Sequence, residues 1–372
     1  MVRECFERKC LPSTLRDGII TLLPKGNKPR DMISSYRPIT LLNTSYKVIS
    51  GVIANRIKQV IPKLISLSQT GFIKGRFIGE NTRLMSDVVA YLKQNRQTAL
   101  LISLDIEGAF NSVSWKFIKA ILKNQNFPEQ MLSWFEILYE GSLARVLYNG
   151  HLSGPIPLFR SCRQGDPLSC YLFLLVMKCL IKMIQNNPQI KGITICDFVC
   201  KVSCYCDDTL CMLDGSVNSC RALFNDLGVF AKFSGLAPNI AKTQAMWVGS
   251  NTETKESICH DLQIQWVKRM KVLGIVFEND DEAMGENNFE LKYVEMQAAI
   301  KMWSNIYLTV YGKITVIKSL LLPKFTHLFA ALPTPSADFV KKMNTALFNF
   351  LWGGKRDKVS RKSVYRSTYM GA

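Results

Sequence analysis

The sequence predicts an α+β protein built from two or three lobes. The chain has 372 residues, which is more than one ordinary hydrophobic core organises. Hydrophobic residues make up 48% of it, enough for a large core. Short apolar runs bounded by turn residues alternate with longer segments of helical periodicity. These observations favour a mixture of strands and helices over an all-helical or disordered chain.

The order of the expected elements follows from these patterns. Asn43 is a plausible N-cap for a helix that should end at Pro62. Asn149-Gly150 predicts a tight hairpin turn. The acidic segment 278–286 is expected to be a loop before a helical, basic C-terminal part. The expected strands are 18–23, 99–104, 144–148, 151–157, 199–205, 209–213 and 272–277, and the other expected helices are 80–93, 115–122, 129–139, 167–184 and 219–233.

The net charge of +18 indicates a polyanionic partner, and nucleic acid is the first candidate. A basic protein kept soluble by its charge, or one bound to an anionic membrane, is the alternative. Met1–Cys10 lacks the apolar core of a signal peptide, so the 12 cysteines are expected to be reduced thiols. The longest apolar stretch, Tyr171–Met177, is too short to cross a bilayer. We therefore expect an intracellular protein of the nucleus or cytoplasm that is neither secreted nor transmembrane.

Carboxylates follow two of the apolar runs. Asp105 comes directly after 99–104, and Asp207-Asp208 forms the tip of the hairpin 199–213. A buried unpaired carboxylate is costly, and adjacent carboxylates repel each other unless solvent or a cation intervenes. For the pair alone, a solvated turn explains the pattern equally well. Together, the three could converge on two Mg²⁺ ions, with Mn²⁺ as a substitute, in an arrangement suited to phosphoryl transfer.

A series of motifs extends along nearly the whole chain. The segment Arg163–Ser169 lies between the Asp105 strand and the Asp207 hairpin, and Tyr205–Asp208 forms the tip of that hairpin. These segments resemble the "RQGDPLS" motif and the "YxDD" box of the reverse transcriptases of LINE-type (non-LTR) retrotransposons. The other matching segments are Tyr36–Asn43, Gln69–Phe72 with Gly75-Arg76, Leu104–Phe110, Ser234–Leu236 with Asn239 and Lys242, Leu273–Ile275, and Gly312-Lys313 with Ile317–Ser319.

The resemblance implies a right-hand polymerase fold. Residues 1–98 would form the fingers. Residues 99–285 would form a palm with an antiparallel sheet and a helical insertion after the first catalytic strand. Residues 286–372 would form a helical thumb and the start of a connector. The implied activity is RNA-directed DNA synthesis, a nucleotidyl transfer in which the 3′-hydroxyl of a DNA primer or target DNA is extended with dNTPs on an RNA template. No membrane or protein partner is implied.

The resemblance also assigns roles to single residues. Asp105, Asp207 and Asp208 would be the catalytic metal ligands, and Lys242 would protonate the leaving pyrophosphate. The ring of Phe110 would lie under the sugar and exclude a 2′-hydroxyl, although Phe110 taken alone is better explained as a core aromatic. The remaining implied contacts are Lys74, Arg76, Gln164 and Gly165 to the nucleotide, and Leu273, Gly274, Lys313 and Lys318 to primer and template.

Competing interpretations remain for several of these residues. Lys74, Arg76 and Lys242 could be solvated surface charges. Departures from the family pattern would suit a decayed copy that binds nucleic acid without catalysis; they are Gly108, Asn111, Cys170 and Ala237-Pro238. A polymerase like the group II intron maturases is a further alternative. A structural zinc site among Cys196, Cys200, Cys204, Cys206, Cys211, Cys259 and His260 is disfavoured because no Cys-x₂-Cys pair is present.

Overall fold

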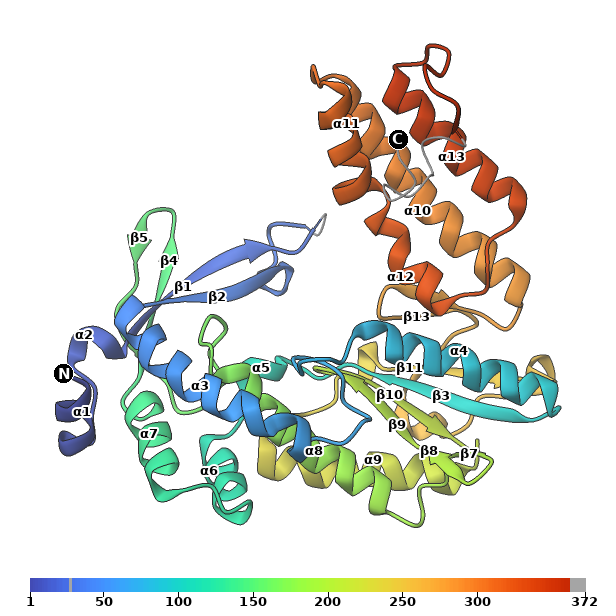
Figure 1. Cartoon of the computed structure of the whole chain (residues 1–372). Helices are drawn as coiled ribbons and strands as arrows, with labels where there is room; N and C mark the ends of the chain where they lie inside the picture. The colour runs from blue at the N-terminus through green and yellow to red at the C-terminus, as the bar shows by residue number, and fades with distance from the viewer. Residues whose placement is uncertain (27–28, 362–372) are drawn as a thin grey trace.

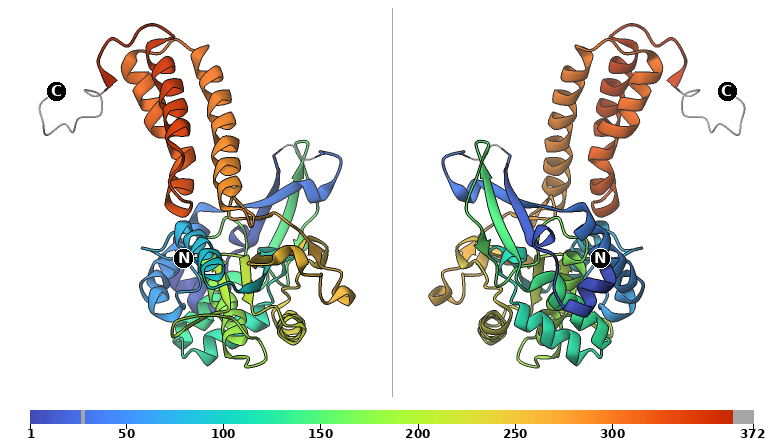
Figure 2. Two further views of the ribbon diagram at one scale, coloured as in Figure 1. Left: turned by 90° about the vertical axis from the view of Figure 1, so that its right-hand side faces the viewer. Right: turned by 90° about the vertical axis from the view of Figure 1, so that its left-hand side faces the viewer.

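The computed structural model describes residues 1–26 and 29–361. The last part of the predicted thumb and connector, 362–372, lies outside the described residues. Figures 1 and 2 show a central sheet with helices packed around it, a strand hairpin above one end and a helical region standing above the other. The predicted α+β class is confirmed. We call the sheet with the hairpin the fingers, the central sheet the palm and the helical region the thumb, after the predicted parts.

The palm sheet has β3 at its centre. Its strand order is β12-β11-β3-β10-β9, and its only parallel pair among the described strands is β11 with β12. The bounds are β3 Thr98–Leu104, β9 Val202–Tyr205, β10 Asp208–Leu213, β11 Gln244–Gly249 and β12 Gln265–Trp266.

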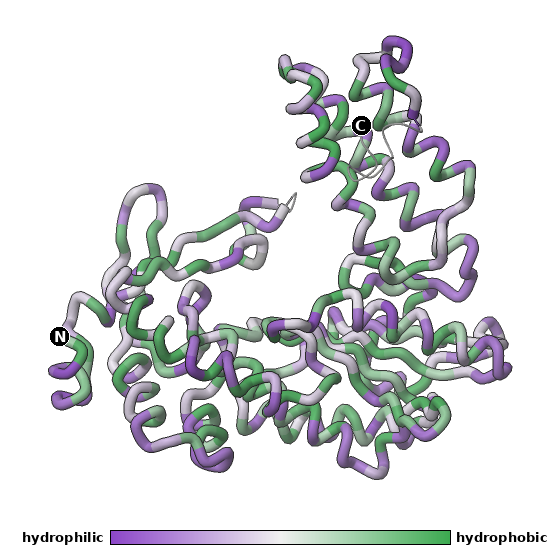
Figure 3. Tube along the Cα trace, in the orientation of Figure 1, coloured by the Kyte–Doolittle hydropathy of each residue, from purple (hydrophilic) through white to green (hydrophobic). Residues whose placement is uncertain are grey.

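Both faces of β3 are buried, which explains its unbroken apolar run. Leu100, Ile102 and Leu104 belong to one core with α8 (Ser169–Asn186) and α9 (Val217–Ser234). The alternate residues Ala99 and Leu101 belong to a second core with α4 (Ile78–Gln94) and the thumb helices. Figure 3 shows the resulting concentration of hydrophobic residues along the palm strands.

The fingers sheet takes strands from two distant parts of the chain. β1 (Asp17–Pro24) pairs antiparallel with β2 (Tyr36–Leu42) and parallel with β4 (Leu143–Tyr148). β5 (His151–Leu152) and β6 (Ile156–Pro157) both pair with β4. Strand β4, from the range predicted for the palm, is thus part of the sheet that carries the fingers hairpin.

Helices join and flank these two sheets. In α3 (Thr44–Leu64) the Asn43 side chain accepts a hydrogen bond from the Ser45 N–H, which confirms the predicted cap. The prediction that this helix ends at Pro62 was wrong by two residues. The Arg76 guanidinium donates to the carbonyls of Pro62 and Ile65, which serves the unpaired acceptors of the last turn. The remaining helices of this part are α1 Val2–Arg8, α2 Ser13–Arg16, α5 Ala109–Ser112, α6 Trp115–Asn124 and α7 Glu129–Tyr139.

Three predicted strands are interrupted, and one of them, 151–157, is divided into β5 and β6. The segment 272–277 is a tight hairpin of β13 (Met270–Val272) and β14 (Ile275–Phe277), because Leu273 and Gly274 both adopt positive φ, 48° and 88°. The predicted strand 199–205 is divided between two strands. Its first residues belong to β8 (Phe198–Cys200), which pairs with β7 (Ile193–Ile195) outside the palm sheet, and the rest form β9. Apolar content alone does not reveal such breaks.

The thumb is helical, as predicted. It consists of α10 (Asp281–Ser304), α11 (Val310–Val316), a π-helical turn at Ile317–Leu321, α12 (Pro323–Ala331) and α13 (Ala337–Trp352). The prediction that 278–286 forms a loop was wrong, because α10 begins inside this segment. Asp280 accepts hydrogen bonds from the N–H groups of Glu282 and Ala283, and acidic residues are stabilised at a helix N-terminus.

Two helical stretches of the described chain are long and apolar enough to span a membrane by length and composition alone. Ser169–Asn186 is mostly buried, as the central helix of the palm core. Of Val310–Ala331, in the thumb, 28% is buried.

Candidate active site

The structure brings the three predicted aspartates to one edge of the palm sheet. Leu104 pairs with Thr209 across β3 and β10, so Asp105 and Asp208, the next residues outward, lie at the same end of these strands. Burial raises the pKa of the Asp208 carboxyl, and the negative charges of Asp207 and Asp105 raise it further, although the side chain keeps one side in solvent. The three carboxylates therefore act on each other electrostatically.

Lys242 lies beside this cluster. Its Nζ is 3.5 Å from Oδ2 of Asp105, and both side chains are about half exposed or more. The adjoining backbone is also fixed, because the Asn239 N–H donates to the Asp105 carbonyl at 2.7 Å. The structure thus places the predicted proton donor next to the carboxylates.

The donor set fits a hard divalent ion. No three or more His, Cys, Asp or Glu side chains in the described parts of the chain form a ready-made metal cage. Mg²⁺ does not require one, because it usually takes one or two carboxylates and fills its shell with water and substrate phosphates. Burial is the larger cause of the raised pKa of Asp208, and a cation would relieve the repulsion from Asp207 and Asp105 that adds to it.

The turn carrying Asp207 is unusually constrained. Cys206 has φ of 61°, a left-handed conformation that few non-glycine residues adopt. The fully buried Gln69 amide holds this turn from both sides. Its Oε1 accepts from the Cys206 N–H at 2.8 Å and its Nε2 donates to the Cys206 carbonyl at 3.0 Å. The side chain of Gln69 therefore fixes the backbone of the turn that carries Asp207.

The loop that carries Gln69 lies directly on the hairpin. A Cβ on Gly71 would be 2.5 Å from the Cys206 nitrogen, so only glycine allows this approach. Asn81 of α4 completes the attachment, with its Nδ2 donating to the Cys204 carbonyl and its Oδ1 accepting from the Thr70 hydroxyl. Sequence reasoning missed the roles of Gln69 and Asn81. The available signal was that these two polar residues flank a segment with three glycines, Gly71, Gly75 and Gly79.

Phe110 is partly buried and faces the same region. Its ring stacks on Phe173 with centroids 4.4 Å apart and meets the edge of Phe72 at 6.4 Å. The turn Gln164-Gly165 packs on β2, where the Thr40 N–H donates to the Gln164 carbonyl. Gly165 has φ of 111°, and a Cβ there would be 2.5 Å from the Thr40 carbonyl. These contacts join the palm to the fingers sheet.

A buried polar network supports that turn from beneath. Asp166 accepts from the hydroxyls of Tyr139 and Ser169 at 2.7 and 3.1 Å. Arg163 donates to the Tyr46 hydroxyl and to the Leu138 carbonyl, and its guanidinium lies over the Tyr46 ring. Arg163 and Asp166 are the first and fourth residues of the "RQGDPLS" segment. Because their charged side chains face the interior, they hold the backbone of this segment in place.

The two predicted cations of the fingers loop differ. Lys74 is exposed and makes no ion pair within the described chain. The Arg76 guanidinium donates to four carbonyls, those of Pro62, Ile65, Ser66 and Gln69. In this conformation Arg76 orders the loop and is not available to a phosphate.

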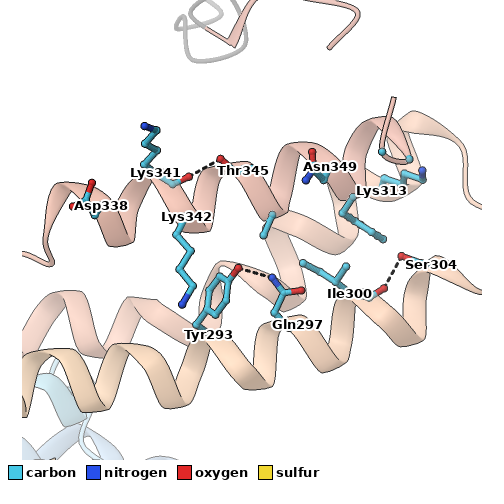
Figure 4. A pocket seen from close by; sticks show the side chains of 14 residues that line it. Tyr293, Gln297, Ile300, Ser304, Lys313, Asp338, Lys341, Lys342, Thr345 and Asn349 are labelled. Atoms are coloured by element: carbon cyan, nitrogen blue, oxygen red, sulfur yellow. Dashed lines mark hydrogen bonds between the residues drawn. The ribbon is translucent and has the colours of Figure 1, made fainter. Parts of the chain in front are cut away.

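The predicted primer and template contacts fall in two places. Leu273 helps to line a small cavity of about 40 Å³ that Asp208 also lines, so the turn Leu273-Gly274 is close to the carboxylates. Lys313 lies on a groove of about 820 Å³ between α10, α11 and α13, with its Nζ 5.7 Å from the Phe350 ring centroid. Figure 4 shows this groove, which Lys341 and Lys342 also line. Lys318 is exposed in the π-helical turn.

The remaining cysteines are not part of this site. Cys200 and Cys204 point into the interior, and burial raises the pKa of the Cys204 thiol to about 12. The twelve cysteines, all within the described residues, are free thiols.

Comparison with known proteins gives the family. Residues 23–277 match the family described as "Reverse transcriptase (RNA-dependent DNA polymerase)". Among curated proteins, the chain is 27% identical over 367 residues to "Transposon TX1 uncharacterized 149 kDa protein" of Xenopus laevis, covering 95% of this chain and 27% of that protein. It is 25% identical over 164 residues to "RNA-directed DNA polymerase from mobile element jockey" of Drosophila melanogaster, covering 44% and 18%.

A third curated relative is the "Retrovirus-related Pol polyprotein from type-1 retrotransposable element R2" of Popillia japonica, 26% identical over 62% of this chain and 32% of that protein. Among solved structures, telomerase from Candida tropicalis with a fragment of telomeric RNA has a TM-score of 0.52 at 11% identity, covering 98% of this chain and 66% of that one. This likeness shows the fold alone. The chain spans about a third or less of the three curated relatives.

Proposed function

Because this chain belongs to the reverse transcriptase family, we propose that it extends a primer 3′-hydroxyl with dNTPs on an RNA template by two-metal nucleotidyl transfer. The primer would be DNA, supplied as such or as nicked target DNA. The observation that carries the proposal is the meeting of Asp105, Asp207 and Asp208 at one sheet edge, where burial and mutual repulsion raise the pKa of Asp208. The relatives support a non-LTR retrotransposon origin. The protein would act in the nucleus or cytoplasm.

The three aspartates would hold two Mg²⁺ ions, and Mn²⁺ would substitute. When bound, the ions stabilise the charge on the attacking and leaving oxygens. Lys242, at 3.5 Å from Asp105, would supply the proton to the departing pyrophosphate. Gln69 and Gly71 keep the Cys206 turn in place, so the carboxylates need little reorganisation when substrate arrives.

The neighbouring side chains would bind the nucleotide. Phe110, fixed by its stack on Phe173, would lie beneath the deoxyribose and leave no room for a 2′-hydroxyl. Gln164 and Gly165 would line the pocket, and Lys74 is better placed than Arg76 to reach the triphosphate. Leu273 and Gly274 would contact the primer end, and Lys313 and Lys318 the template–primer backbone, where cations position a duplex without reading its sequence.

A primer-extension assay tests the proposal. The full chain receives an RNA template, a DNA primer, dNTPs and Mg²⁺, and Asp207→Asn is measured beside it. We expect extension by the parent chain and a loss of about 1,000-fold or more in the variant, because the charge holding the ions is removed. Asp197→Asn is the matched control, since Asp197 is exposed in the turn between β7 and β8.

Two results would contradict the proposal. Extension by Asp207→Asn at the parental rate would show that this carboxylate holds no catalytic ion. Soluble, folded parent chain that binds template–primer in a salt-sensitive way without extending it would instead identify an inactive remnant, for which the departures at Gly108 and Asn111 would be the first explanation.

A further inference from the structure

A second pocket lies beside the candidate active site. Its volume is about 600 Å³, within the range of roughly 300–1,000 Å³ usual for ligand sites. Asn111 and Ser112 of α5 line it, whereas the preceding Phe110 turns its ring to Phe173. None of the residues proposed above for metal, nucleotide or primer contacts lines it. We call this site the back pocket; its remaining walls are strands β1 and β2, segment 157–163, Ser114, Lys116 and the C-terminal end of α9.

Every charged side chain that lines the back pocket is a cation. Lys116, Arg160, Arg163 and Lys232 line it, and no Asp or Glu does. Lys116, Arg160 and Lys232 are exposed, and within the described chain none of these three forms an ion pair. Arg163 is buried, with two of its guanidinium nitrogens lacking an acceptor. Unpaired cations gathered in a concave site attract phosphate groups.

Two phenylalanines stand among these cations. Phe159 is 79% exposed and Phe233 is 66% exposed, and both line the pocket. Large exposed rings bury little surface and so contribute little to folding stability. They offer flat faces on which nucleic-acid bases stack. Stacking tolerates every base, so rings interleaved with cations are typical of sites that bind single strands without reading their sequence.

We propose that the back pocket binds single-stranded nucleic acid, with bases stacked on Phe159 and Phe233 and successive phosphates at Lys116, Arg160 and Lys232. The three cations come from three separate segments, α6, the loop before Arg163 and α9, which suits phosphates spaced along a strand. A free nucleotide carries the same base and phosphate chemistry and is the competing occupant. This proposal rests on the proposed function in one respect, namely that nucleic acid is the substrate. The site itself is separate from the candidate active site.

Binding of a fluorescent oligothymidylate or oligouridylate, measured by anisotropy, tests this site. Unlabelled template–primer hairpin is added to saturation first, so that the catalytic site is occupied. Lys116→Glu with Lys232→Glu should weaken strand binding about tenfold or more and flatten its salt dependence. Phe159→Ala with Phe233→Ala should weaken it about fivefold or more with the salt dependence retained.

Matched controls isolate the pocket. Lys182→Glu reverses one charge at an exposed position of α8, and Phe198→Ala removes one ring that is also 66% exposed. Both should stay within about twofold of the parent. All four altered side chains of the pocket are exposed, so thermal midpoints and extension of a short blunt-ended hairpin carrying a one-nucleotide overhang should be unchanged.

The proposal is overturned if neither double variant weakens strand binding more than the controls do. It is also overturned if dTTP displaces the strand at an equal concentration of nucleotide, which would make the pocket a mononucleotide site. A parent chain that binds the strand here but extends no primer would refute the polymerase proposal and leave this one standing.

Discussion

The hairpin that carries Asp207 and the thumb are built in opposite ways. The turn at Cys206 is fixed by buried hydrogen bonds from Gln69, whose amide is completely shielded from water. In the thumb, Tyr307 is 98% exposed and Tyr311 is 83% exposed. The sequence between Glu295 and Asp338 contains no acidic residue but four lysines. The difference teaches that individual hydrogen bonds determine the geometry of the palm site. In the thumb, the total positive charge and the exposed surface are what a ligand would meet.

The largest expected effect comes from Gly71→Ala. The added Cβ would meet the Cys206 nitrogen at 2.5 Å and its Cα at 3.0 Å, so the turn carrying Asp207 must shift. A displacement of about 1 Å at reacting groups costs on the order of 100-fold in rate. We expect a loss of that size in single-turnover primer extension. Gly51→Ala, where a Cβ would meet nothing within 4 Å, is the control, and equal rates for both variants would refute the argument.

Gln69→Ala tests the same attachment through stability. It leaves the N–H groups of Cys206 and Gly71 and the carbonyl of Cys206 without partners in the interior. Buried unsatisfied groups cost about 1–3 kcal/mol each, with partial relief from relaxation, so we expect the free energy of unfolding in urea to fall by about 2–5 kcal/mol.

The control for this variant is Gln185→Ala. Gln185 is exposed and donates one bond, to the Ser68 hydroxyl at 2.9 Å, so its loss should stay within about 0.5 kcal/mol. If the two variants unfold at the same denaturant concentration, the Gln69 amide does not hold the turn.

Lys318→Gln should act through charge alone. Its side chain is exposed in the thumb, so stability should not change. Removing one phosphate contact should weaken template–primer binding a few-fold and reduce the slope of log affinity against log salt by about 0.9. Binding titrations at several salt concentrations measure both, with Lys182→Gln as the control. A large loss that is independent of salt would mean that the thumb, like the palm, depends on specific geometry.

The smallest expected effect is the change in folding stability with pH that comes from the Asp208 carboxyl. Its raised pKa means that the folded chain binds this proton more tightly than the unfolded chain. The associated stability is present at low pH and is lost as pH rises through the usual carboxyl range and the raised pKa. Asp208→Asn removes this dependence, so at about pH 7 its thermal midpoint should exceed that of the parent chain.

The advantage of the variant should shrink toward about pH 4 and should also shrink when Mg²⁺ is added, because the ion offsets the repulsion in the parent chain. Asp197→Asn, in an exposed turn, serves as the control and should show neither dependence. A constant difference between Asp208→Asn and the parent at every pH would remove the electrostatic explanation.

Much of the fold could be predicted from local patterns. The apolar run before Asp105, the Asn43 cap and the hairpin at Asn149-Gly150 each involve neighbours in sequence, and all were confirmed. The parallel pairing of β4 with β1 could not be predicted, because it joins residues more than a hundred positions apart. The break at Leu273-Gly274 was missed because an apolar run shows hydrophobicity and not the sign of φ.

By itself, the sequence determined which chemical groups are present and in what order. The acids Asp105, Asp207 and Asp208 end or connect strands whose apolar residues must be buried, and burial is a local preference of each side chain. Only the tertiary structure decided what the polar groups face. Gln69 reaches Cys206 across 137 positions, and Arg76 turns toward the end of α3. A hydrogen bond specifies a partner by position in space, and no local pattern encodes that position.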